Sequence, residues 1–280
     1  MCLVALATAL FAAACARPVP VTLPVPRSVA LEVPGDSKLY QDIWDTGCNI
    51  FQVTARLTLR GRVAGKRPRS VIWVASAATA FRLEASEGER PFVLTSVATV
   101  PPQVATLQLP DGRLAHSTDV AALVQLATGL PFSGGELHRL LTTCPTRDGG
   151  GPVSYRPSSD ALDLILSDTP DAADVLHFAR DDASASWRLL AMTSTRQSLP
   201  LRWRTEFHAP IATVPRTFRL TSLDWKGQPG GEFDVLVVVD HVQVSPMIEP
   251  RLFEPATASG ERMTLEELKT SGVRLPLLVD

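Results

Sequence analysis

Apolar and polar side chains alternate with a period of two along much of the chain, and this alternation restricts the fold more than any other feature. Its clearest example is the segment 51–60, where every odd position is apolar and every even position is polar. Successive side chains of a β-strand point to opposite faces, so the pattern predicts a strand with one buried face. Similar patterns predict further strands at Ser70–Ala75, Thr79–Ser86, Phe92–Ser96, Val104–Leu109, Leu162–Leu166, Val175–Arg180, Trp187–Thr193, Leu201–Phe207, Thr217–Leu223 and Phe233–Val244.

About eleven strands without helices alternating between them exclude a doubly wound α/β fold and favour an antiparallel sheet. The Asp111-Gly112 pair predicts a tight turn into a partner strand at Leu114–His116. The segment Val235–Val239 is apolar on both faces, so we expect this strand to be covered on both sides. The Gly-, Pro- and Ser-rich segment Thr146–Ser159 is interpreted as a long loop rather than a domain boundary, because the strands before and after it share one pattern.

Helices are expected mainly in one interruption of the strand series. Asp119 can cap a helix over Val120–Thr128, and Ser133 with Glu136 forms a capping box for a second helix. The second helix carries an apolar stripe of Leu137, Leu140, Leu141 and Cys144. Shorter helices are predicted at 37–47 and after the Thr264–Glu267 capping box.

The first fifteen residues differ in character from the strand series that follows. Leu3–Ala14 is almost wholly apolar and ends in small residues before Cys15, as in a secretory signal that is too short to span a bilayer. The Ala-Ala-Cys ending resembles a bacterial lipobox, in which the Cys thiol is acylated; the alternative is an ordinary signal peptide with an incidental Cys. We therefore expect a lipoprotein signal peptide at 1–14, a Pro-rich extended tether at 15–35 and a β domain at 36–280.

Two cysteines remain beyond the signal and the acylation site. In an oxidising compartment, Cys48 and Cys144 can form a disulfide, which in the chain-entropy model stabilises by roughly 4–5 kcal/mol; two separate buried thiols are the alternative. Neither cysteine has another Cys or His at ligand spacing, so no metal site is expected.

The composition and the motifs argue against several classes of function. The formal net charge is −2, which provides no overall positive field for nucleic acid. The chain has no G-x-S-x-G motif, and its five histidines are scattered, so each is interpreted as a surface or strand residue rather than a ligand. We expect no enzyme and no cofactor; a Ser or Asp beside His208 or His241 in a cleft would instead indicate a hydrolase.

Abundant inward-facing apolar side chains without a reactive cluster indicate a binding function. A curved sheet with helices packed into its open side can enclose an apolar cavity, where long apolar ligands bind by burying surface. The candidate lining residues are Phe81, Leu83, Phe92, Leu94, Leu107, Leu109, Leu137 and Leu141, which can equally well fill a dry core.

One basic cluster lies in a predicted hairpin turn. Lys66, Arg67 and Arg69 occur close to Arg60 and Arg62. This cluster is either a solvated turn or a patch for anionic lipid head groups or an acidic partner.

Several segments follow one another in a recognisable order: the lipobox, the first strand with its Gly61-Arg62 step, Phe81–Ala85, Pro91–Ser96, the Leu109–Arg113 turn, the Gly-x-Pro link at Gly129–Pro131 and the Leu265–Leu268 helix. Taken in order, these segments resemble the outer-membrane lipoprotein-localisation proteins of LolA/LolB-like fold, and the likeness covers about 230 residues.

The resemblance implies a mainly β fold, a single unclosed antiparallel β-barrel of about eleven strands with a helical lid against its open, concave side. It also implies an outer-membrane lipoprotein, closest to the lipidated insertase type, anchored at the periplasmic face. Such a protein binds the acyl chains of lipoproteins or phospholipid, receives cargo from a periplasmic carrier and acts as a monomer. Its membrane or cargo loop would contain Val97 or Val100. The alternative is a non-enzymatic interaction or sensor lipoprotein of the same fold.

Overall fold

A computed structural model describes residues 31–32, 52–68, 71–77, 79–87, 90–97, 104–130, 132, 134–143, 153–157, 160–169, 172–180, 187–196, 201–211, 214–245, 249–254, 261–271 and 278–279. Its strands are β1 (Leu31–Glu32), β2 (Gln52–Val63), β3 (Arg67–Pro68), β4 (Val71–Ala77), β5 (Ala80–Glu87), β6 (Arg90–Val97), β7 (Val104–Gln108), β8 (Leu114–Ser117), β9 (Val153–Pro157), β10 (Ala161–Thr169), β11 (Ala172–Ala179), β12 (Arg188–Arg196), β13 (Leu201–Ile211), β14 (Val214–Leu223), β15 (Pro229–Ser245), β16 (Arg262–Thr264) and β17 (Leu278–Val279). The helices are α3 (Val120–Thr128), α4 (Gly134–Thr142), α5 (Leu265–Thr270) and the 3-10 turn η2 (Pro250–Phe253).

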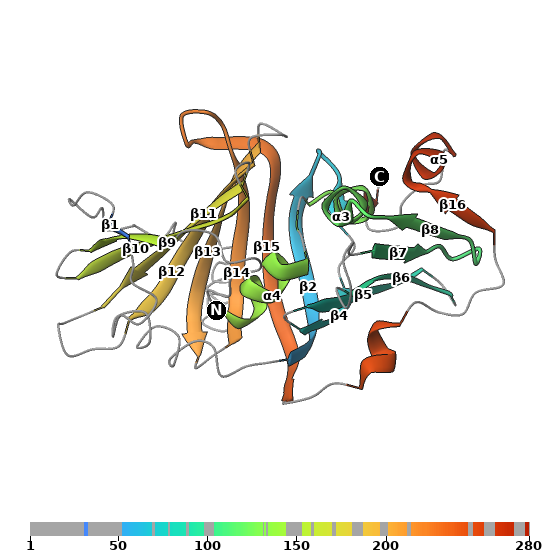
Figure 1. Cartoon of the computed structure of the whole chain (residues 1–280), viewed down its shortest axis with the longest axis horizontal. Helices are drawn as coiled ribbons and strands as arrows, with labels where there is room; N and C mark the ends of the chain where they lie inside the picture. The colour runs from blue at the N-terminus through green and yellow to red at the C-terminus, as the bar shows by residue number, and fades with distance from the viewer. Residues whose placement is uncertain are drawn as a thin grey trace, which may run out of the picture.

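Fifteen of these strands form one curved sheet (Figure 1). Its order is β1-β9-β10-β11-β12-β13-β14-β15-β2-β4-β5-β6-β7-β8-β16. The two outer strands do not pair with each other, so the barrel is unclosed among the described residues. The expectation of a mainly β, unclosed, antiparallel architecture with few helices is confirmed.

Three details of the strands go beyond this confirmed architecture. The sheet has fifteen strands rather than about eleven, because very short strands such as β1 and β16 extend its edges. The segment Thr146–Ser159 is not wholly a loop, since β9 lies within it and pairs with both β1 and β10. The sheet is also not wholly antiparallel, because β16 runs parallel to β8.

The sheet consists of two meanders that meet at its centre. Strands β2 and β4 to β8 follow one another in space as in sequence, and so do β9 to β15. The two series join where β15 pairs with β2, from Phe233 opposite Val63 to Ser245 opposite Gln52. Gly61 permits this pairing, because its φ is +134° and a Cβ there would collide with the carbonyl oxygen of Asp234.

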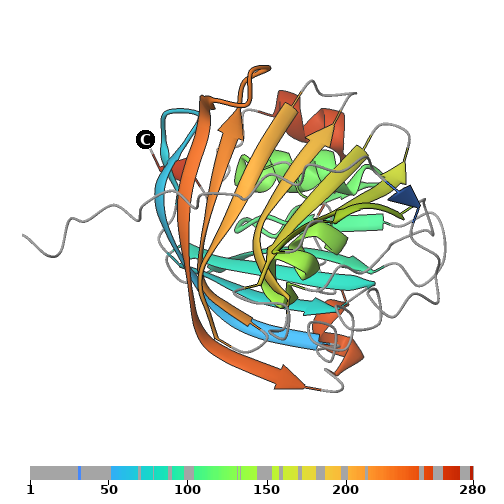
Figure 2. The ribbon, with the colours of Figure 1, turned by 90° about the vertical axis from the view of Figure 1, so that its left-hand side faces the viewer.

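Helices α3 and α4 connect the two meanders and lie inside the curve of the sheet (Figure 2). The side chain of Asp119 accepts a hydrogen bond from the Ala122 N–H, and Gly129 ends α3 in the left-handed conformation with φ +73°. The Thr264–Glu267 capping box of α5 is confirmed. The expected Ser133 cap of α4, Cys144 and the helix expected at 37–47 lie outside the described residues.

The core fills the space between the concave face of the sheet and the two helices. Alternate residues of the long strands face it: Val53, Leu57 and Leu59 of β2 are buried, whereas Thr54 and Arg56 are only half-buried. In the doubly apolar part of β15, Val235, Val237 and Val239 are buried, while the intervening Leu236 and Val238 are half-buried on the convex face.

Candidate functional site

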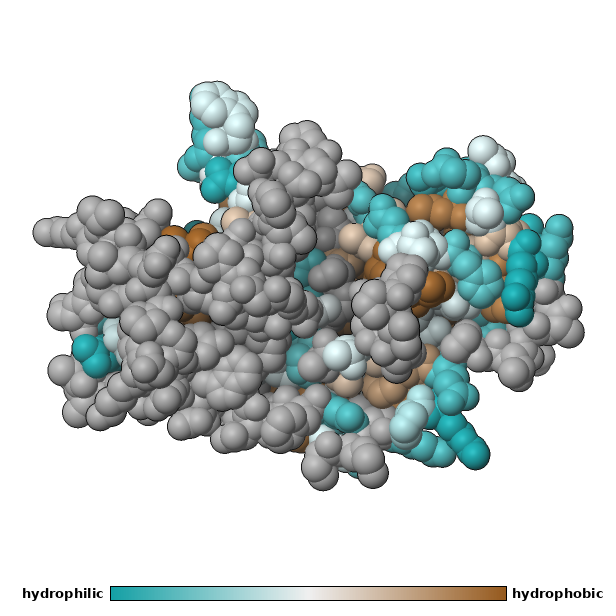
Figure 3. All heavy atoms as spheres, in the orientation of Figure 1, coloured by the Kyte–Doolittle hydropathy of each residue, from teal (hydrophilic) through white to brown (hydrophobic). Residues whose placement is uncertain are grey.

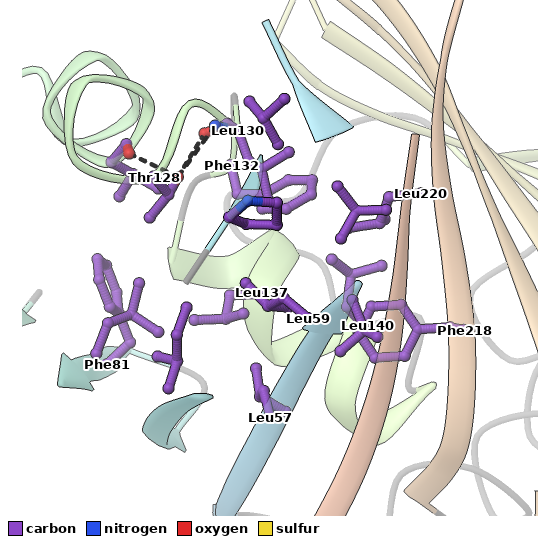
Figure 4. Close-up of a pocket in the computed structure, with 17 residues that line it drawn as sticks. Leu57, Leu59, Phe81, Thr128, Leu130, Phe132, Leu137, Leu140, Phe218 and Leu220 are labelled. Atoms are coloured by element: carbon purple, nitrogen blue, oxygen red, sulfur yellow. Dashed lines mark hydrogen bonds between the residues drawn. The ribbon is translucent and has the colours of Figure 1, made fainter. Parts of the chain in front are cut away.

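An apolar cavity of about 50 Å³ lies between the sheet and the two inner helices. Seventeen residues line it: Leu57, Leu59, Val63, Pro68, Ile72, Phe81, Leu83, Val124, Thr128, Leu130, Phe132, Leu137, Leu140, Phe218, Leu220, Val235 and Val237. Figure 4 shows side chains from the central strands pointing toward those of α4 and of the α3–α4 link. The cavity therefore lies where the two meanders and the helices converge.

Among the described residues, the cavity lining offers no unused polar side chain to a ligand. Thr128 is the one polar residue in this described lining, and its hydroxyl donates to the Val124 carbonyl at 2.8 Å and accepts from the Leu130 N–H at 3.0 Å (Figure 4). The other lining side chains are aliphatic or phenyl groups. Such a surface binds by excluding water and selects for apolar ligands without specific hydrogen bonding.

The helix α4 forms a lid that is fixed to the sheet by polar contacts on two sides. On one side, Ser76 Oγ of β4 and His138 Nδ1 lie 3.1 Å apart. On the other side, Arg139 Nη2 donates to Asp174 Oδ2 of β11 at 2.9 Å, and both side chains are 2% exposed. These contacts reach strands on opposite sides of the central β15–β2 pair, so α4 bridges both halves of the sheet.

The environment of α4 changes the protonation of His138. Burial, together with the adjacent Arg139 charge, lowers the pKa of His138 to about 4, so this ring is neutral at pH 7. The expectation that every histidine is a surface or strand residue is wrong for His138, which is buried on a helix. The reason is that α4 lies inside the curved sheet, where its polar side chains meet strands instead of water.

The predicted lining residues occupy two different places. Phe81, Leu83 and Leu137 line the cavity. The remaining five are buried in the surrounding core but are not part of the lining: Phe92, Leu94, Leu107, Leu109 and Leu141.

Several other lining residues were not among the sequence candidates, although the alternation of apolar and polar residues places them on the inward face of their strands. Leu57, Leu59, Phe218, Leu220 and Val235 are inward members of strands that the alternation predicts. Alternation identifies the buried face of each strand, but it does not indicate which strands line the cavity. That depends on the pairing of β15 with β2, which brings these strands under the lid.

Several sequence candidates fall outside the described residues. Cys15, Cys48, Cys144 and Val100 are among them, and Val97 is the last residue of β6. Within the described part of the chain, no cluster of three or more His, Cys, Asp or Glu residues could hold a metal ion. None of the helices in that same part combines the length and apolar character needed to span a bilayer.

Comparisons with known proteins give a likeness of fold. No family model and no curated protein matches the sequence. Among solved structures, a LolA superfamily protein from Nitrosomonas europaea is similar, with 8% identity, a TM-score of 0.48 and coverage of 78% of this chain and 96% of that one.

Two further structures are similar over comparable lengths. One is a domain assigned to outer membrane lipoprotein sorting from Vibrio parahaemolyticus, with 12% identity, a TM-score of 0.45 and coverage of 78% of this chain and 95% of that one. The other is a DUF1329 family protein from Desulfovibrio piger, with 8% identity, a TM-score of 0.41 and coverage of 79% and 98%. At these identities and TM-scores the likeness gives no function.

Proposed function

We propose that this protein binds the acyl chains of lipids or lipoproteins between its sheet and the α4 lid. The observation that carries the proposal is the described lining of the cavity, in which the one polar residue, Thr128, has its hydroxyl engaged by the backbone. A saturated acyl chain needs no polar partner and gains about 0.8 kcal/mol for each buried methylene group.

Binding requires the lid to move. A cavity of about 50 Å³ holds only a few water molecules, so an acyl chain must separate α4 from the strands beneath it. The chain would replace contacts between apolar side chains with contacts to itself. The same apolar surface then stays out of water in the loaded and the empty protein.

We extend the proposal to the place of action. Acylation of Cys15 and the Pro-rich segment 15–35 would tether the β domain to the periplasmic face of a bacterial outer membrane. There it would accept lipoproteins from a periplasmic carrier and help localise or insert them.

The small volume of the empty cavity favours a second candidate function. A non-enzymatic interaction or sensor lipoprotein of the same fold would keep this space closed and bind no lipid. The two functions therefore differ in whether the purified protein contains or takes up acyl chains.

We propose no enzymatic role. Ser76 and His138 are paired as in a serine hydrolase, but in the closed structure Ser76 is 0% and His138 2% exposed, so the hydroxyl is shielded from an ester. Because His138 is on α4 and Ser76 is on β4, movement of the lid away from the strands would separate the pair. The Nε2 atom of His208 lies 4.0 Å from Oε2 of Glu206, and the ring of His241 lies beside Trp73 on the outer surface. Neither of these contacts supplies the Ser or Asp partner in a cleft that a hydrolase needs.

The first test fills the cavity from α3. Val124→Phe places a larger apolar side chain in the lining, whereas Leu126→Phe makes a similar change on the same helix outside it. We expect Val124→Phe to lower the affinity for cis-parinaric acid at least tenfold and Leu126→Phe to leave it nearly unchanged. Mass spectrometry of extracted lipid should show the same loss of copurifying acyl chains, with thermal unfolding as the control for folding.

The contrary outcomes are equally specific. Wild-type protein that neither contains lipid nor binds cis-parinaric acid would favour the interaction lipoprotein. Equal affinity losses in the two variants would place the acyl site elsewhere.

A further inference from the structure

The most exposed large apolar side chain of the described residues belongs to the β14–β15 hairpin. Trp225, at the tip of this hairpin, is 82% exposed. The hairpin stands clear of the body of the molecule at the upper edge of Figures 1 and 3. An indole ring prefers burial or the boundary between water and an apolar phase, so an isolated exposed Trp suggests an external contact.

The turn that carries Trp225 is ordered by its own hydrogen bonds. Asp224 Oδ1 accepts hydrogen bonds from the Lys226 and Gln228 N–H groups, both at 2.8 Å. The Asp224 N–H donates to the Gln228 carbonyl at 2.7 Å, and Gly227 adopts φ +78°. This network holds the tip in a compact turn with the indole ring outside it.

One cation lies beside the indole ring, and two more lie at the neighbouring turn. Lys226 Nζ lies 4.8 Å from the centre of the Trp225 ring. Lys66 and Arg67, both exposed, lie at the adjacent β2–β3 turn. The Ala64 N–H of this turn donates a hydrogen bond to the Glu232 carbonyl of β15 at 2.6 Å.

The two hairpins carry more positive than negative charge. Segments 60–68 and 223–234 together contain five cations, Arg60, Arg62, Lys66, Arg67 and Lys226. They contain three carboxylates, Asp224, Glu232 and Asp234, which leaves a local excess of two positive charges. Asp234 already pairs with Arg219 at 2.8 Å, and Asp224 is engaged in the turn.

The cavity extends to the same end of the sheet. Val63 and Pro68, which flank the basic β2–β3 turn, both line the cavity. Val63 is also opposite Phe233 in β15, and Phe233 lies four residues after Pro229, where β15 begins. The basic turn therefore adjoins the cavity lining, and β15 connects this end of the sheet to the hairpin that carries Trp225.

We propose that the Trp225 hairpin and the Lys66–Arg67 turn form a contact site for anionic phospholipid surfaces. Trp225 inserts at the level of the head groups, and the cations pair with lipid phosphates. The site deepens the proposed function, because it would bring the cavity end of the β domain against the bilayer. It lies on a different connection from Val97, which ends β6, and from Val100, which comes after β6 in the sequence.

Vesicle binding tests this site in the full chain carrying Cys15→Ala, which cannot be anchored by acylation. The probes are vesicles of phosphatidylethanolamine with phosphatidylglycerol, compared with vesicles of phosphatidylcholine. Trp225→Ser should lower partitioning into the anionic vesicles about tenfold. Trp73→Ser is the matched control, because Trp73 is 51% exposed on another surface of the sheet, and it should leave partitioning within about twofold.

The charge contribution has its own variant. The double change Lys66→Gln with Arg67→Gln should lower partitioning into anionic vesicles on the order of tenfold, with no effect on phosphatidylcholine vesicles. Circular dichroism of each variant checks folding. Trp225→Phe keeps an apolar ring at the tip, so it should retain most of the partitioning that Trp225→Ser loses.

The outcomes separate the two proposals. Partitioning that is unchanged by Trp225→Ser, or reduced equally by Trp73→Ser, would overturn the contact site. Loss of vesicle binding with retained cis-parinaric acid binding supports it. Vesicle binding by a wild-type chain that takes up no acyl chain would support the contact site while contradicting the proposed function.

Discussion

At the scale of single residues, His138 shows how burial determines protonation. The ring is 2% exposed and its Nδ1 lies 3.1 Å from Ser76 Oγ. Removal from water penalises the imidazolium form, and the Arg139 charge next to it acts in the same direction. The neutral ring is therefore part of the folded lid at pH 7.

His138 predicts a pH dependence of stability. Its folded pKa of about 4 lies below the ordinary value of 6.5, so the unfolded chain binds the proton first as the pH falls. Stability from the neutral ring is complete above pH 6.5 and is lost between pH 6.5 and 4, by on the order of 3 kcal/mol. Urea unfolding across this range should show a shallower pH dependence for His138→Gln; identical slopes for the two proteins would contradict the assignment.

Residue-level prediction from the sequence was strongest in the strands. Alternation places Phe81 and Leu83 on the inward face, and both line the cavity. The sequence pattern did not predict the burial of His138, because the amphipathic interpretation of a helix assumes that one of its faces is in water. Strands of both halves of the sheet contact α4, so His138 and Arg139 are buried together with the apolar stripe.

At the scale of elements, the lid combines apolar packing with a buried ion pair. Leu137 and Leu140 of α4 line the cavity, while Arg139 reaches Asp174 on a distant strand. A buried ion pair stabilises less than an apolar pair of similar volume, because both charges lose their hydration. Opening the lid returns that hydration, so this pair favours a lid that can be released.

This argument predicts contrasting single and double variants. Arg139→Met removes the guanidinium that faces the buried Asp174 carboxylate and should lower the free energy of unfolding by about 3–5 kcal/mol. Adding Asp174→Leu should recover most of that loss and slow the release of cis-parinaric acid, because the lid then opens without gaining ionic hydration. Urea denaturation measures the first effect and stopped-flow displacement the second. Faster release from the double variant would contradict the role of the ion pair in opening.

Element prediction failed where strands are short. The Gly-rich stretch that precedes Val153–Pro157 led to its interpretation as loop, and Arg262–Thr264 has too few residues to show a period. Both segments become strands by pairing with an existing edge, β10 for the first and β8 for the second. Their structure comes from long-range pairing, which local sequence does not encode.

At the scale of the whole molecule, the proposed anchor makes a prediction in cells. If Cys15 is acylated, labelled palmitate should be incorporated into the wild-type chain and the protein should fractionate with the outer membrane. Cys15→Ser should lose the label and move to the soluble periplasmic fraction. Unchanged fractionation with loss of the label would show that another contact, such as the Trp225 hairpin, suffices for attachment.

The position of β2 at the centre of the sheet has a consequence for the order of folding. This strand is made early, but its partner β15 lies more than half a chain length later, with Gln52 opposite Ser245. Each meander can form from neighbouring hairpins, whereas the joint between them must close a very long loop of chain, which makes it slow. Until then one edge of β2 has unpaired backbone groups that can pair with other chains. A protein of this topology is therefore most exposed to aggregation before its last long strand is available, when synthesis of the chain is nearly complete.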